Sequence, residues 1–132
     1  MNLYRPALSM LLACSLCMPV VATAAHWDAV LLTDLGLYHF DPHTVSDKGG
    51  VKSIQTLLDY KTTQETAEGK KYRSSQTEIQ LNCKNQSARI MHTTYFAGAM
   101  GAGQEVLKEG SVREWLDVVK GTPIERIAHR VC

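Results

Sequence analysis

The sequence lacks an excess of charge of either sign. Its 132 residues carry 14 Lys and Arg against 13 Asp and Glu, a formal net charge of +1. This balance argues against nucleic acid as the partner, because phosphate binding takes a basic surface. Charge runs, low-complexity tracts, internal repeats and coiled-coil heptads are also missing from the sequence. Neither a repeat architecture nor a linker between two domains is therefore predicted.

One long apolar run stands at the start of the sequence, and its anatomy is that of a secretory signal. Arg5 precedes an apolar stretch over residues 7–21, and the small residues 22–25 form a site suited to cleavage. We predict a cleaved signal peptide over residues 1–24 and a single domain over residues 25–132.

Two other interpretations of this leader stay open. A retained membrane anchor needs about 20 apolar residues, and polar or helix-breaking residues thin this stretch at Ser9, Ser15, Pro19 and Thr23. The run up to Cys14 resembles a lipobox, whose cysteine becomes lipidated, but here the apolar run continues past that cysteine. Cleavage without a lipid anchor is the interpretation that we favour.

Cysteine is sparse, and its positions predict one disulfide. Cys14 and Cys17 would leave with the leader, so that Cys83 and Cys132 are left to pair. Disulfides form in oxidising spaces such as a periplasm or the cell exterior, which agrees with an export signal. Closing a loop of this length stabilises a fold by about 4 kcal/mol in the chain-entropy model. We predict the bridge Cys83–Cys132.

Alternation of apolar and polar residues with a period of two predicts a mainly β fold. Turn residues separate the runs, and the polar segment 62–69 is expected to be a loop. Cys83 follows Ile79 and Leu81 on the apolar side of its run, which predicts that it faces the core. The expected strands cover residues 27–32, 37–41, 51–61, 71–84, 88–96 and 104–108.

The spacing of the apolar residues changes near the C-terminus, where a helix is predicted. Thr122 suits the N-cap, Pro123 the first helical position, and Glu125 completes a capping box. Four apolar residues then recur at helical spacing: Ile124, Ile127, Ala128 and Val131. The expected fold class is α+β, mainly β: an antiparallel sheet of about six strands, with one C-terminal helix packed on a face and tied by the disulfide.

Several short motifs, in their order along the chain, resemble the surface-adhesin protein E family of Gram-negative bacteria. The resembling segments are 26–30, 38–42, 57–61, 72–75, 79–83, 98–103, Trp115 and 131–132. The resemblance implies an adhesin-E-like domain over residues 25–132, with a sheet and a disulfide-tied terminal helix. It also implies export to the periplasm or cell surface of a Gram-negative bacterium and binding to a host extracellular-matrix protein. A lipid anchor is typical of the family's adhesin, and the leader here departs from that pattern.

Motifs for nucleotide or nucleophile chemistry are weak. The glycines of residues 98–103 follow the order G-x-x-G-x-G, without the Lys-Ser/Thr and helix that a phosphate cradle needs. A glycine-permitted bulge or wide turn is expected there instead. Ser74 and Ser75 lie in an expected strand, and no G-x-S-x-G is present. We predict no catalytic residue, no cofactor and no enzymatic activity.

Histidines offer the other candidate chemistry. His39 and His43 are four residues apart, but Pro42 makes a helix through both of them improbable. His26 and His92 could lie near these two histidines only if the fold brings them together. Ordinary surface or hydrogen-bonded histidines are therefore expected, and no metal site is predicted.

Two classes of function follow from the sequence. The favoured one is a non-enzymatic exported interaction domain, similar to a bacterial surface adhesin, that binds a protein partner. The alternative is a periplasmic module that binds a small ligand, a metal or haem, or that maintains the envelope, with the histidines or a pocket beside the helix as its site. Trp27 and Trp115 are expected to be core or hinge anchors, and either of them, if exposed, would mark a contact patch. The two free edges of the sheet predict a possible homodimer by strand pairing.

Overall fold

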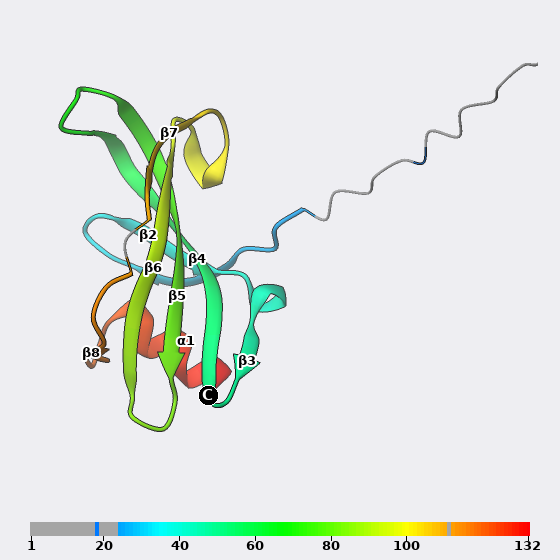
Figure 1. Cartoon of the computed structure of the whole chain (residues 1–132). Helices are drawn as coiled ribbons and strands as arrows, with labels where there is room; N and C mark the ends of the chain where they lie inside the picture. The colour runs from blue at the N-terminus through cyan, green and yellow to red at the C-terminus, as the bar shows by residue number, and fades with distance from the viewer. Residues whose placement is uncertain (1–17, 19–23, 111) are drawn as a thin grey trace, which may run out of the picture.

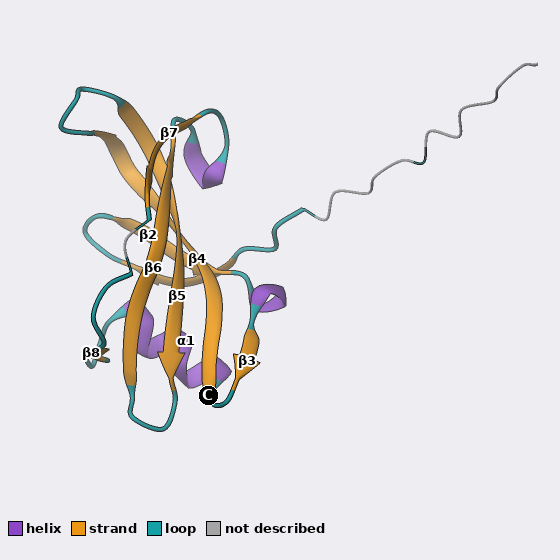
Figure 2. Ribbon diagram, in the orientation of Figure 1, coloured by secondary structure: helices purple, strands orange, loops and turns teal. Residues whose placement is uncertain are grey.

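The computed structural model describes residue 18 and residues 24–110 and 112–132. The predicted signal peptide therefore lies almost wholly outside the described residues, and its cleavage stays a prediction. Figure 1 shows a strongly twisted antiparallel sheet with one α-helix against one face, and Figure 2 shows how little of the chain is helical. The elements are β1 (Asp28–Leu32), β2 (Gly36–Phe40), η1 (Pro42–Thr44), β3 (Ser46–Lys48), β4 (Val51–Glu65), β5 (Lys71–Asn82), β6 (Ser87–Phe96), η2 (Ala99–Gly101), β7 (Glu105–Glu109), β8 (Leu116–Asp117) and α1 (Pro123–Val131).

Six strands form the continuous sheet, in the order β1-β2-β4-β5-β6-β7. Two short strands extend it, β3 beside β4 and β8 beside β6. Every pairing is antiparallel. The predicted α+β architecture, with about six principal strands and one C-terminal helix, is confirmed.

The core lies between α1 and one face of the sheet. Its fully buried members are Phe40, Ile54, Ile79, Leu81 and Ile127. The other apolar residues predicted for the helix face, Ile124, Ala128 and Val131, pack around this cluster. Burial of these side chains holds a helix that is too short to be stable alone.

Both ends of α1 are fixed. At its start, Thr122 Oγ1 accepts a hydrogen bond from Glu125 N at 3.3 Å, which confirms the predicted N-cap. The Glu125 carboxylate accepts from Gly121 N at 2.6 Å, one residue earlier than a standard capping box would place the donor. At its end, Cys132 is bonded to Cys83, with the two Cα atoms 5.6 Å apart. The predicted disulfide is therefore present, and it ties the last residue of the chain to the end of β5.

The strand boundaries differ from the prediction by one or two residues, except at the end of β4, where the difference is larger. Residues 62–65, expected in a loop, continue β4, because pairing with β5 resumes after an irregularity, with Gln64 opposite Tyr72 and Glu65 opposite Lys71. Most of these residues are exposed. Because neither face of this part of β4 is buried, its sequence does not alternate between apolar and polar residues. No helix among the described residues is long and apolar enough to cross a membrane.

Candidate functional site

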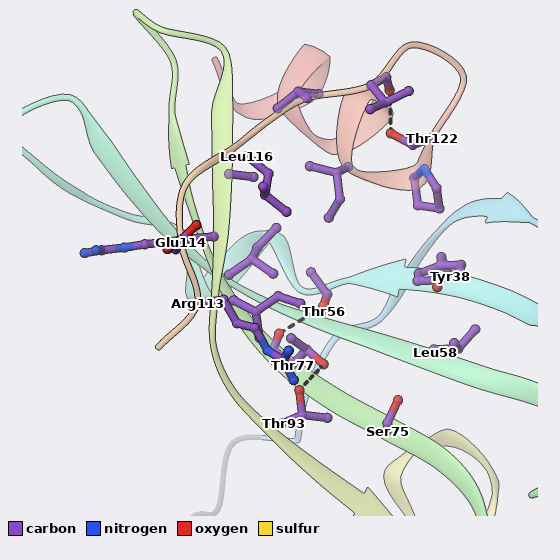
Figure 3. Close-up of a pocket in the computed structure, with 18 of the residues that line it drawn as sticks. Tyr38, Thr56, Leu58, Ser75, Thr77, Thr93, Arg113, Glu114, Leu116 and Thr122 are labelled. Atoms are coloured by element: carbon purple, nitrogen blue, oxygen red, sulfur yellow. Dashed lines mark hydrogen bonds between the residues drawn. The ribbon is translucent and has the colours of Figure 1, made fainter. Parts of the chain in front are cut away.

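The helix covers only part of the face on which it lies. Nine residues of α1 span about 14 Å at about 1.5 Å per residue, whereas the 12 residues of β5 span about 40 Å at about 3.3 Å per residue. The uncovered part of this face forms the floor of a groove of about 470 Å³. Its lining includes Tyr38, Thr56, Leu58, Thr77, Thr93 and Leu116 (Figure 3).

The floor of the groove is a row of hydroxyl residues from three neighbouring strands. Thr56 on β4 lies opposite Thr77 on β5, which lies opposite Thr93 on β6. Thr56 Oγ1 donates to the carbonyl of Thr77 at 2.9 Å, and the hydroxyls of Thr77 and Thr93 are 3.0 Å apart. The hydroxyls are therefore hydrogen-bonded along the sheet, and the floor carries no ionised side chain.

Tyr38, Tyr60 and Tyr95 line the groove. Tyr72 packs edge-on against Tyr60 and Tyr95, with ring centroids 5.4 and 4.8 Å apart. Tyr95 donates its hydroxyl to Glu109 Oε2 at 3.2 Å. Burial, followed by the charge of Glu109 and this hydrogen bond, raises the pKa of Tyr95 to about 12. Burial also raises the pKa of Tyr38, so both phenols remain neutral at physiological pH.

Residues 112–119, here called the strap, form the side wall of the groove. The strap is held to β6 by a hydrogen bond from Arg113 N to the carbonyl of Ile90 at 2.8 Å and by the β8 pairing. In that pairing Leu116 lies opposite Ala88, a residue that packs on the core, so Leu116 lies on the groove side. Asp117 lies opposite Ser87 and on the other side.

Trp115 lies on the outer side of the strap, and the prediction that it is a core anchor is wrong. Its side chain is 37% exposed and packs against the guanidinium of Arg89, with Arg89 Cζ 4.6 Å from the ring centroid. Arg89 Nε in turn donates to Gln80 Oε1 at 2.9 Å. The strap runs along the sheet rather than between two layers, which leaves this tryptophan partly in solvent. Trp27, the other expected anchor, is partly buried.

The histidines do not form a common site. His39 on β2 is buried with Nδ1 unpartnered, whereas His92 on β6 has its Nδ1 3.3 Å from Glu78 Oε2, with β4 and β5 between them. His26 and His43 stack at a centroid distance of 5.2 Å. Within residues 24–110 and 112–132, no three His, Cys, Asp or Glu side chains gather as metal ligands would.

The glycine run 98–103 forms a turn on the face opposite α1, around η2. The buried Ser74 Oγ donates to the carbonyl of Gly98 at 2.7 Å and accepts from Gly101 N at 2.8 Å. Met100 adopts a positive φ of 55°, and its N–H donates to Asp59 Oδ1 at 2.9 Å. The expected glycine turn is therefore present, and Ser74 anchors that turn from within its strand.

The strap is the feature that the sequence interpretation missed, and of the groove it offered only a pocket beside the helix, without the residues that line it. The only sequence signal for the strap was the apolar cluster around Trp115-Leu116, followed by Val118 and Val119 and flanked by charged residues. Its short β8 has two residues, too few to show an alternating pattern.

A twisted antiparallel sheet with a disulfide-tied terminal helix defines a small, mainly β domain, and residues 27–132 match the sequence model of the family described as surface-adhesin protein E. The chain belongs to this family. Among solved structures it is similar to Haemophilus influenzae protein E, with 18% identity and a TM-score of 0.63 over 83% of this chain and 90% of that one. A second crystal form of that protein has 16% identity and a TM-score of 0.62, covering 72% and 79% of the two chains. At these identities the similarity shows the fold. No curated protein sequence matches this chain.

Proposed function

We propose that this protein is a non-enzymatic, exported adhesin-like domain that binds an extracellular-matrix protein. The match to the surface-adhesin family over residues 27–132 carries the proposal. The disulfide between Cys83 and Cys132 supports export, because such bonds persist in oxidising compartments. Pairing of two copies along the outer strands β1 or β7 stays a separate prediction.

The outer side of the strap is the surface best suited to a protein partner. Trp115 and Arg89 lie in contact there, and tryptophan and arginine are enriched among residues that dominate protein interfaces. Val112, also exposed, extends the apolar area along the same segment. Arg89 is held in place by its hydrogen bond to Gln80, so that less side-chain freedom is lost on binding.

Binding measurements on surface variants test this proposal. The disulfide-bonded domain is assayed against purified collagen, fibronectin and laminin. We expect Trp115→Ala to weaken binding to the recognised matrix protein by about ten-fold or more, which is the range of interface hot spots. Leu35→Ala, which truncates an exposed apolar residue in the β1–β2 turn, is the matched control and should bind normally. Lack of binding to every matrix protein, or full binding by Trp115→Ala, would contradict the proposal.

Display at the cell surface needs its own measurement. Labelling of intact cells with an impermeant reagent should modify exposed lysines such as Lys120, and the same reagent should modify them equally after the cells are opened. Labelling only after opening would place the protein in the periplasm. That result would rule out an adhesin role while leaving ligand binding in the groove open.

A further inference from the structure

The groove contains apolar side chains that no other described residue covers. Leu116 lies on the groove side of β8, yet it is 68% exposed, and Val119, which also lines the groove, is 64% exposed. Ile90, across from them on β6, is likewise exposed. An occupant of the groove would remove these side chains from water, which is the main source of affinity in apolar sites.

The floor of the groove suits a hydrocarbon better than a polypeptide. Its strands β4, β5 and β6 each pair with neighbours on both sides, so their backbone groups are committed to the sheet. The hydroxyls of Thr56, Thr77 and Thr93 are already hydrogen-bonded. A peptide backbone laid on this floor would lose its hydrogen bonds to water and find few replacements, a loss that a hydrocarbon chain does not suffer.

Two arginines line the groove, of which Arg89 is held against Trp115 and Gln80, and Arg113 is the one that points into it. Figure 3 shows the Arg113 side chain directed from the strap towards Thr77 and Thr93. The ion pairs found among the described residues do not involve Arg113. Two carboxylates also border the groove, but Asp117 lies on the other side of β8 and Glu114 stays beside the strap.

We propose that the groove binds an amphiphile with a single hydrocarbon chain and an anionic head group. The chain lies on the floor against Leu58, Ile90 and Leu116, and the head group pairs with Arg113. The volume of about 470 Å³ falls within the roughly 300–1,000 Å³ typical of small-ligand sites. This site uses the inner side of the strap, whereas the proposed protein contact uses Trp115 on the outer side.

Calorimetric titration of the disulfide-bonded domain tests the site, with dodecanoate as the probe and dodecyltrimethylammonium as its oppositely charged counterpart. Both are kept below the concentration at which they form micelles. We expect saturable binding of one dodecanoate per domain, tighter than that of the cationic probe by about ten-fold, the effect of one favourable charge contact. Arg113→Glu should reverse this preference, and Arg126→Glu, on the exposed side of α1, should leave it unchanged.

A matched pair of strap variants locates the hydrocarbon chain. Leu116→Asp should weaken dodecanoate binding by about ten-fold or more, because it places a charge against the chain. Val112→Asp alters a comparably exposed residue, 55% against 68%, that does not line the groove, and it should bind normally. Circular dichroism checks that each variant is folded. If Leu116→Asp does not fold, the probe preference of Arg113→Glu serves as the test of the site.

Three outcomes would overturn the proposal. The first is the absence of saturable binding by either probe. The second is equal weakening by Leu116→Asp and Val112→Asp, which would mean adsorption to exposed apolar side chains. The third is loss of matrix-protein binding, but not of dodecanoate binding, in Leu116→Asp, which would mean that a polypeptide occupies the groove. Trp115→Ala should leave dodecanoate binding intact, so that failure of this site and failure of the proposed adhesin function can be told apart.

Discussion

Gly36 occupies a point where two strands approach too closely for a side chain. It pairs with Tyr60 across β2 and β4, and a Cβ atom at this position would overlap the carbonyl oxygen of Asp59. We expect Gly36→Ala to lower the free energy of unfolding by about 1–3 kcal/mol, because the central pairing must shift to admit the methyl group. Gly110→Ala, with open space around its Cβ position, is the control for denaturant unfolding and should change stability little. Equal stability of the two variants would contradict this explanation.

Tyr95 makes stability depend on pH in the alkaline range. Its pKa is raised from 10.0 to about 12 in the folded protein, so the folded state holds the phenol proton more tightly than the unfolded chain does. The stabilisation is therefore present in full below the unfolded pKa, near 10, and is lost as the pH rises to about 12. Denaturant unfolding at increasing alkaline pH should show a smaller loss of stability in Tyr95→Phe than in the unsubstituted protein. Identical pH profiles would show that Tyr95 does not contribute.

At the scale of elements, α1 depends on its covalent attachment. We expect the double variant Cys83→Ser with Cys132→Ser to lose about 4 kcal/mol of unfolding free energy, since the bond limits the freedom of the unfolded chain. A reducing agent should lower the unfolding midpoint of the unsubstituted protein and leave that of the double variant unchanged. Insensitivity of the unsubstituted protein to reduction would contradict a stabilising role for the bond.

The elements also show what the sequence could and could not reveal. The helix was predictable because Thr122, Pro123 and four spaced apolar residues give independent local signals for one structure. The long strands were predictable from alternation, because one of their faces is buried. The strap was not, since its residues are exposed and held by a few backbone hydrogen bonds, and such contacts leave little trace in composition. The position of Trp115 was predicted wrongly because its contact, Arg89, comes from a distant part of the sequence.

At the scale of the whole molecule, the groove results from a difference in length between α1 and the central strands of the sheet. A nine-residue helix lies against a sheet whose central strands have 15 and 12 residues, so one layer must be incomplete. Both lengths were approximately evident in the sequence, and the uncovered surface could have been inferred from them. Its neutral floor could not, because Thr56, Thr77 and Thr93 come together only through the register of three strands.

The bond between Cys83 and Cys132 also determines how the molecule responds to mechanical tension. It closes a covalent ring that contains β6, β7, the strap and α1, with a sequence separation of 49 residues between its ends. If a partner holds the strap while the N-terminal end is pulled, the force passes from residues 24–82 into the ring at Cys83. Only the segment before the ring can then be drawn out to its full contour length. The outer surface of the strap, with Trp115 and Arg89, lies within the ring and is thus protected by a chemical bond from complete extension. The groove is not, because Thr56 and Thr77 of its floor lie on β4 and β5, in the segment that is drawn out.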